Sequence, residues 1–455
     1  MLDLNSRHEN KCIRRAAVWW LFSILLVFGG ILPIIKPGTV SADPDVFRWT
    51  RINTPGSLPD KNDIVSPCEV NRIAVGSDGK TLYAVDIANP NQTNGSKALY
   101  KSTDGGISWS DTISRHLYQS MTPAEQANFR VWNIALAPDD IDFIAVVTSD
   151  NTSTLPGNVW LSTNGGAEWQ NTSCPAADNI STIDVSESYG SHDIAIGTRT
   201  GSGSGSVLIL KASDYNKWLN QGFNGDILSL KFSPNYRNDA TIAIIYSDLT
   251  GTYLNAGSRD LYANTTDWSI VYGGSPPEIT AGGPGTSPKA NQIIVADLEL
   301  PLDFLGQALS LRRYYVSIDD AGASDNAGIY RIDGTVTYQL MSATGKRISS
   351  IAYYGNYASG KLLAGEVLGD PCSATVMTWF TDSPITCPIP CWYPSMKPPT
   401  GAAGTDNCTG SGFGNAQVAW SPDGSTAYAG TASTSTLQTG AAWPVPYLTG
   451  ENLDE

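Results

Sequence analysis

Side chains that could bind a metal are concentrated in two parts of this sequence. Asp319, Asp320, Asp325 and Asn326 form an oxygen-rich segment of the kind that can hold calcium. Because their spacing lacks the regular alternation of a known calcium loop, we expect a solvated loop there. A Pro-rich stretch further on contains four cysteines, for which zinc binding and disulfide formation are the competing chemistries: Cys372, Cys387, Cys391 and Cys408.

Disulfide formation is the favoured interpretation of the cysteines. Their spacings fit no familiar zinc pattern, and the nearest histidine, His192, is far away in sequence. The sequence has seven cysteines, and Cys12 precedes an N-terminal apolar run, so an even number follows. An even count in an exported chain predicts disulfides, with the pairing open, among Cys68, Cys174, Cys372, Cys387, Cys391 and Cys408. We expect no bound metal and no cofactor.

Charge and histidine content exclude two further classes of function. The formal net charge is −15, and nucleic-acid binding needs clustered Lys and Arg to neutralise phosphates. After the N-terminal segment, His116 and His192 are the remaining histidines, which leaves few candidates for histidine-based acid–base catalysis. Charged residues make up 16% of the chain, against a usual value of about 25%. Ser, Thr, Asn and Gly supply the hydrophilicity instead, as in many β-rich exported proteins.

The N-terminus has the features of an export signal. Lys11, Arg14 and Arg15 precede an uncharged apolar run over residues 16–35, and Val40-Ser41-Ala42 fits a cleavage site before Asp43. The alternative is an uncleaved anchor, because twenty such residues could span a bilayer. Either way residues 1–42 predict export to the periplasm, the cell surface or the medium, with membrane contact through an uncleaved segment alone. Residues 43–455 form the mature part.

An internal repeat runs through the mature chain. An apolar strand that ends in a turn such as Ala-Pro-Asp or Ser-Pro-Asp recurs seven times, for example at residues 133–139 and 417–424. Each copy is followed by a second short strand rich in small and β-branched residues. Third strands come next, and the fourth strands open on Trp109, Trp169, Trp218 and Trp268. The pattern predicts an all-β fold, a single seven-bladed β-propeller of four-stranded blades, because a β-sandwich would not repeat its units.

Two parts of the chain depart from the regular repeat. Residues 297–313 look like an excursion inserted between the first two strands of blade five. The seventh blade lacks a fourth strand, and residues 47–52 resemble the Trp-led strands elsewhere, so we expect them to close the ring and remove an exposed edge. The alternative is that Glu455 falls inside a blade of a longer protein.

One motif occurs between the third and fourth strands of the first two blades. Residues 102–109 match the pattern S-x-D-x-G-x-[T/S]-W at every fixed position, and residues 162–169 match it with Asn for Asp and Glu for the hydroxyl. The acidic or amide side chain is expected to cap turn N–H groups, while Gly takes a left-handed conformation and Trp packs beneath. The residues given this structural role are Ser102, Asp104, Gly106, Trp109, Ser162, Asn164, Gly166 and Trp169.

The motif and the repeat together resemble the Asp-box (BNR-type) β-propellers, which include sialidases, sortilin-type receptors and bacterial xyloglucanases. The resemblance implies that Asp104 is structural and lies away from the ligand face. A sialidase-like activity would need an arginine triad, for which Arg72, Arg130, Arg237 and Arg347 are scattered candidates. The early Arg-Ile-Pro signature is missing, since residues 51–53 read Arg-Ile-Asn. A xyloglucanase-like activity would need carboxylates that face each other across two propellers, and this sequence predicts a single propeller.

Binding is therefore the leading expectation, with no catalytic residue assigned. Long connections at residues 54–70, 114–130, 273–290 and 394–414 are predicted to share one face of the ring. Trp392 and Tyr393 are the candidate ligand-binding residues beside them, although Trp392 fits equally well as a core residue of blade six. We expect a monomeric exported protein that recognises a protein or a glycan, with a glycoside hydrolase on the same scaffold as the alternative.

Overall fold

Six antiparallel sheets make up the part of the chain that the structure describes. The computed structural model describes residues 70–86, 95, 98–150, 152–153, 155–214, 216–320, 325–342, 347–367, 378–385, 390–394 and 414–433. The first three sheets contain β1 (Val70–Val75), β2 (Leu82–Asp86) and β3 (Leu99–Ser102); β4 (Val131–Ala137), β5 (Asp140–Ser149), β6 (Pro156–Ser162) and β7 (Gln170–Asn171); and β8 (Asn179–Val185), β9 (Asp193–Arg199), β10 (Val207–Lys211) and β11 (Trp218–Asn220).

The other three sheets follow in chain order. They contain β12 (Asp226–Phe232), β13 (Thr241–Ser247), β14 (Thr252–Asp260) and β15 (Thr265–Asp267); β16 (Ile293–Glu299), β17 (Arg313–Asp320), β18 (Gly328–Asp333) and β19 (Val336–Ser342); and β20 (Arg347–Asn356), β21 (Ser359–Val367), β22 (Thr378–Thr381), β23 (Tyr393–Pro394), β24 (Gly414–Trp420) and β25 (Ala427–Ser433). In four of the sheets, four consecutive strands pair in sequence order, which is the connectivity of propeller blades.

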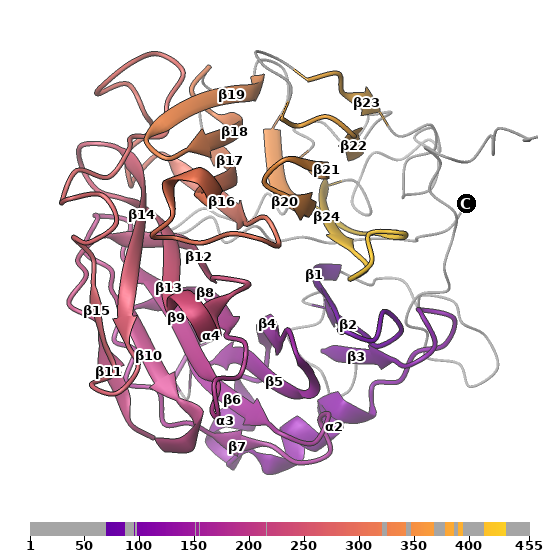
Figure 1. Cartoon of the computed structure of the whole chain (residues 1–455). Helices are drawn as coiled ribbons and strands as arrows, with labels where there is room; N and C mark the ends of the chain where they lie inside the picture. Colours follow the sequence, from indigo (N-terminus) through magenta and orange to yellow (C-terminus); the bar gives the residue numbers. More distant parts are fainter. Residues whose placement is uncertain are drawn as a thin grey trace, which may run out of the picture. The chain divides into compact units, whose positions relative to one another are not determined.

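The first strands of the repeats contact one another in a closed order. Neighbours along this order are β1, β4, β8, β12, β16, β20 and β24, and β24 contacts β1 again (Figure 1). A hydrogen bond of 3.1 Å from Arg72 on β1 to the Gln417 side chain on β24 joins the two ends. The described part of the unit Phe47–Glu455 is therefore a β-propeller whose inner strands surround a central axis.

The predicted count of seven blades is wrong, because the described strands form six sheets. The last two repeats are not separate: β24 pairs with β21 of the preceding repeat through Val367 and Asn415. A single six-stranded sheet thus replaces the expected sixth and seventh blades, in the order β23-β22-β21-β24-β25 with β20 also paired to β21. The proposed closing strand at residues 47–52 lies outside the described residues.

The hydrophobic core lies between neighbouring sheets. Between the first and second sheets, for example, Tyr83 and Val85 of β2 are packed with Ile134, Ile144 and Trp160. The second strands have sheets on both sides, and every residue of β9 is buried, including the charged residues at its two ends, Asp193 and Arg199. A sheet that has a neighbouring sheet on each side is therefore buried on both of its faces.

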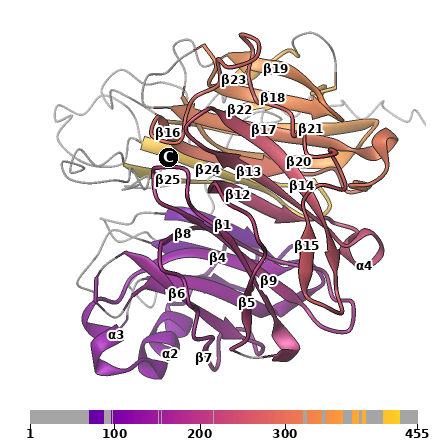
Figure 2. The same ribbon diagram turned by 90° about the vertical axis from the view of Figure 1, so that its left-hand side faces the viewer.

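Two short helices stand where a long loop was expected after the first blade. They are α2 (Thr112–Ser120), which contacts β3, and α3 (Pro123–Ala127), where Glu125 accepts a hydrogen bond from Asn171 of β7 (Figures 1 and 2). Ile113 and Leu117 are spaced one helical turn apart and enter the core, which explains why this segment coils. α3 begins with a capping box between Thr122 and Glu125. The remaining short helices are α4 (Tyr236–Asp239), η2 (Ala212–Asp214) and η3 (Leu309–Leu311).

The predicted excursion between the first two strands of the fifth sheet is confirmed. It connects β16 to β17, buries Phe304 completely, and contains η3. The Leu302 N–H donates to the Gly355 carbonyl on the sixth sheet, and the Asn235 amide beside α4 donates to the Phe304 carbonyl. The excursion therefore ties three neighbouring sheets together. None of the described helices is long and apolar enough to cross a membrane, and residues 16–35 lie outside the described part.

Candidate functional site

A cavity of about 380 Å³ runs along the axis between the inner strands. Its walls come from β1, β4, β8, β12, β16, β20 and β24, together with Leu302 of the excursion. Ligand pockets in proteins typically begin at about 300 Å³, so the cavity has room for a side chain or a small sugar. Its axial position, lined by strands of every repeat, makes it a candidate site.

A repeated bulge fixes which side chains face this cavity. The pairing of the first and second strands shifts register near the start of each of β1, β4, β8, β12, β16 and β20, at the same place in every repeat, and β4 has a second shift at its end. One of the lining residues of each strand lies two positions after the shift. These equivalent residues are Ala74, Ala135, Asp184, Lys231, Asp297 and Ala352. At this position the wall is therefore charged on three consecutive strands and carries alanine on the other three.

The charged residues form one cluster around Lys231. Its ammonium lies 3.3 Å from the Glu299 carboxylate on β16. Asp184 accepts a hydrogen bond of 2.8 Å from the Phe232 N–H on β12, and Asp297 accepts one of 3.0 Å from the Ile351 N–H on β20. The two aspartates thus link neighbouring inner strands as well as facing the cavity. Water reaches the cluster, since the Lys231 and Glu299 side chains are 36% and 22% exposed.

The surroundings of the cluster favour the neutral form of each carboxyl group. Burial raises the pKa of Glu299 to about 7, with repulsion from Asp297 and Asp184 adding to the effect while Lys231 opposes it. Burial likewise raises the pKa values of Asp184 and Asp297. The Glu299 carboxylate keeps the pKa of Lys231 above its ordinary value, so the ammonium stays charged. Three carboxyl groups therefore share one lysine.

Arg72 lies elsewhere on the cavity wall and is occupied by neutral acceptors. Its guanidinium donates to the Asn71 carbonyl at 2.8 Å and to the Gln417 side-chain oxygen at 3.1 Å. Burial lowers the pKa of Arg72, and attraction to Asp297 partly offsets that. Of the four arginines considered for a sialidase-like triad, Arg72 alone is in the cavity lining of the described chain; Arg347 pairs with Asp319. The structure does not bring the four together.

The two segments that match the Asp-box pattern form tight turns after β3 and β6. Asp104 accepts hydrogen bonds from the Ser108 N–H at 2.9 Å and from the Ser102 hydroxyl at 2.8 Å. Asn164 accepts the equivalent bond from the Glu168 N–H, also at 2.9 Å. Gly106 and Gly166 have φ values of 92° and 89°, which an L side chain rarely adopts. The Trp109 indole donates to the Gly106 carbonyl, while Trp169 packs in the core.

Other predicted site residues have mainly structural surroundings. Trp392 packs against the core of the fifth and sixth sheets and donates to the Leu340 carbonyl at 3.0 Å, while Tyr393 is 42% exposed on β23. The expectation of a solvated loop at Asp319 and Asp320 is wrong, because both are buried on β17. Arg347 holds both carboxylate oxygens of Asp319, and no group of three metal-ligating side chains occurs among the described residues.

The structure gives the disulfide prediction no support. Cys174 and Cys391 are free thiols, and the other four named cysteines lie outside the described residues. Burial raises the pKa of Cys174 to about 12, whereas Cys391 is exposed. We therefore expect iodoacetamide without reductant to alkylate Cys391 quickly and Cys174 slowly, since the thiolate is the reactive form. Peptide mapping by mass spectrometry checks this, and a Cys391 that reacts only after reduction would contradict it.

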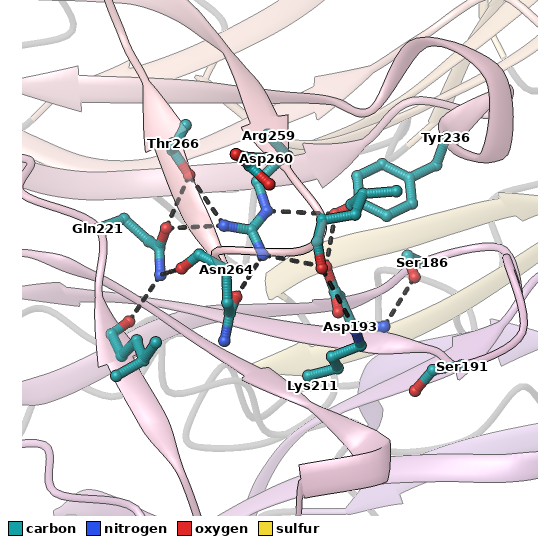
Figure 3. A network of polar contacts seen from close by, with 12 residues as sticks. Ser186, Ser191, Asp193, Lys211, Gln221, Tyr236, Arg259, Asp260, Asn264 and Thr266 are labelled. Carbon is teal, nitrogen blue, oxygen red and sulfur yellow. Dashed lines mark hydrogen bonds and ion pairs between the residues drawn. The ribbon is translucent and has the colours of Figure 1, made fainter.

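A second polar cluster lies between the third and fourth sheets, away from the cavity (Figure 3). Arg259 on β14 forms an ion pair of 3.1 Å with Asp193 on β9, and both side chains are almost completely buried. Tyr236 donates to Asp193 at 2.5 Å, and Arg259 also donates to the Gln221 and Asn264 side chains. Each charge is thus satisfied within the protein. The cluster joins two blades and offers no open position to a ligand.

Comparisons with known proteins give distant structural likenesses. No family model matches the chain. No curated protein sequence matches it either. Solved structures similar to it include "YCF48 bound to D1 peptide" (12% identity, TM-score 0.42, 73% of this chain and 84% of that one). Others are the hydrazine synthase of Kuenenia stuttgartiensis (10%, 0.46, 82% and 96%) and the GH74 enzyme of Niastella koreensis (16%, 0.34, 80% and 54%).

Proposed function

We propose that this chain is an exported binding propeller that recognises a protein or a glycan at the cell surface through its central cavity. Export is supported by the basic and apolar pattern of residues 1–42, and the two hairpin motifs support membership of the Asp-box propellers. The observation that carries the proposal is the cavity itself. It is open to water, and its wall places unevenly distributed charges beside small apolar side chains.

The test is a binding screen with the full chain and two matched variants. Labelled protein is applied to a glycan array and to a peptide array that covers acidic, neutral and basic sequences. The cavity variant is Asp297→Asn/Glu299→Gln, and the control is Asp260→Asn/Asp267→Asn, which makes the same charge change at exposed positions of the outer edge of the fourth sheet. We expect hits that the control retains and the cavity variant loses. Hits that the cavity variant retains, or two arrays without hits, would contradict the proposal.

A glycoside hydrolase is the second candidate, and one observation favours it. Glu299, with its pKa near 7, stands two residues from Asp297 on the same strand, so both carboxyl groups face the cavity. Glycosidases use such a pair, one protonated and one ionised. Turnover of fluorogenic glycosides that Glu299→Gln abolishes would establish this activity. Equal turnover by the variant would exclude Glu299 as the acid.

A further inference from the structure

We propose that the cavity receives the ammonium group of a lysine side chain from a basic segment of a protein partner. The segment would approach the face formed by the turns at the C-terminal ends of the inner strands. This inference rests on the proposed binding function and narrows it to one class of partner. The long connection at residues 273–290 leads into the N-terminal end of β16. The partner would therefore bind on the opposite face of the propeller from that connection.

The charge balance of the cavity cluster points to a missing cation. Asp184, Asp297 and Glu299 lie near two cations of the cavity wall, the ammonium of Lys231 and the guanidinium of Arg72, which attracts Asp297 while it donates to neutral oxygens. Attraction between opposite charges is stronger in a cavity with low-dielectric walls than in bulk water. Burial raises the pKa values of the three carboxyl groups in spite of the attraction from Lys231 and, for Asp297, from Arg72. An inserted ammonium would favour the ionised form of these groups and would match three carboxylates with three cations.

The uncharged part of the wall fits the aliphatic stem of a lysine. Where β8, β12 and β16 contribute Asp184, Lys231 and Asp297, the other inner strands present methyl groups to the same cavity. These belong to Ala74, Ala135, Ala352 and Ala419. Lysine buries its methylene groups on apolar surface while its ammonium seeks polar partners. The alanine methyl groups on one side of the cavity would contact the methylene groups of the lysine, and the carboxyl groups on the other side would bind its ammonium.

The turns around the cluster end of the cavity add a negative field. They carry carboxyl groups in six separate connections between first and second strands, against two exposed basic residues, Lys80 and Arg237. The acidic residues are Asp78, Asp139, Glu187, Asp239, Asp303 and Asp423. Hydrogen bonds within the turns lower the pKa values of Asp78 and Asp423, so both remain ionised at neutral pH. Such a rim attracts basic segments over a distance before contact.

The experiment titrates the full chain with a capped glycine-serine peptide that contains a central run of lysines. Its control ligand is the same peptide with every lysine acetylated. We expect isothermal titration calorimetry to show binding of the lysine peptide, at least about tenfold weaker binding of the acetylated one, and weakening at high salt. Asp297→Asn/Glu299→Gln should weaken binding by a similar factor, and Asp260→Asn/Asp267→Asn should leave it unchanged.

Two further variants keep the test decisive if the double cavity variant folds poorly. Lys231→Met removes the competing ammonium and should tighten binding, whereas loss of a merely structural ion pair would not. Ala74→Leu narrows the alanine-lined side of the cavity without changing charge and should weaken binding. Circular dichroism and thermal melting establish that each variant is folded.

Three outcomes would overturn the inference. Equal binding of the lysine and acetylated peptides would exclude ammonium recognition, and the proposed binding function would still stand if the arrays gave hits dependent on the cavity. Equal binding of the lysine peptide by wild type and folded cavity variants would place the site on the rim alone. Tighter binding of an unacetylated amino-sugar oligomer would show that the ammonium belongs to a glycan.

Discussion

Replacement of Arg259 by methionine should lower the free energy of unfolding by about 3–5 kcal/mol. The change leaves the Asp193 carboxylate buried between two sheets without its ion-pair partner (Figure 3). It also removes donors to the Gln221 and Asn264 side chains. Removal of one partner of a buried pair costs far more than the pair contributes, because the remaining charge has lost both water and its counter-ion. Urea unfolding of the folded variant measures the loss.

Arg115→Met is the matched control for this prediction. Arg115 forms an ion pair of 2.6 Å with Asp111, but its side chain is 49% exposed at the start of α2. Exposed pairs of this kind contribute about 0–1 kcal/mol, so the control should be close to wild type. The double variant Arg259→Met/Asp193→Asn should recover part of the loss. If Arg259→Met is no less stable than Arg115→Met, the cluster around Arg259 does not stabilise the contact between the third and fourth sheets.

The second large effect concerns Glu299 and depends on pH. The pKa of Glu299 is raised from 4.5 to about 7, so the folded protein holds a proton that the unfolded chain releases. Between these two values the folded state binds more protons, and wild-type stability must therefore fall as the pH rises. At about 1.4 kcal/mol per pK unit, the full contribution is about 3 kcal/mol. Glu299→Gln removes this slope, so its stability relative to wild type should rise from about pH 5 to about pH 8.

The control for the pH experiment is Glu168→Gln, at an exposed turn position after β6. Denaturant unfolding at both pH values gives the two differences in free energy of unfolding. A difference between Glu299→Gln and wild type that stays constant across the pH range, as expected for Glu168→Gln, would mean that Glu299 is ionised as easily as an exposed carboxyl group.

The repeated strands were predictable because their pattern is local. The apolar first strands and the buried second strands lie close to the expected positions. Of the outer strands expected to open on Trp, β11 begins at Trp218 and β7 directly follows Trp169, whereas β15 ends before Trp268 and Trp109 is in no described strand. The excursion after β16 was also visible, since it interrupts the repeat. By contrast, α2 was taken for a loop because its helical apolar spacing, Ile113, Leu117 and Met121, is short and lies between strands.

The blade count and the charged cavity depend on contacts between distant segments. Pairing of Val367 with Asn415 merges two repeats into one sheet, and no local signal in either repeat encodes that bond. Asp184, Lys231 and Asp297 come from three repeats, and each follows a register shift that turns it toward the axis. Alignment of the repeats at these positions, where other copies have alanine, is the signal that would have revealed the cluster.

Carboxyl footprinting tests the central claim, that the cavity is the binding site, most directly. Carbodiimide coupling followed by mass spectrometry reports the accessibility of each carboxyl group in the free protein and in the presence of the lysine peptide. Glu299 is open to water in the free protein, so it should be labelled there and protected in the complex, while exposed Asp260 and Asp267 are labelled equally in both. Unchanged labelling of Glu299 in a saturated complex would contradict the claim.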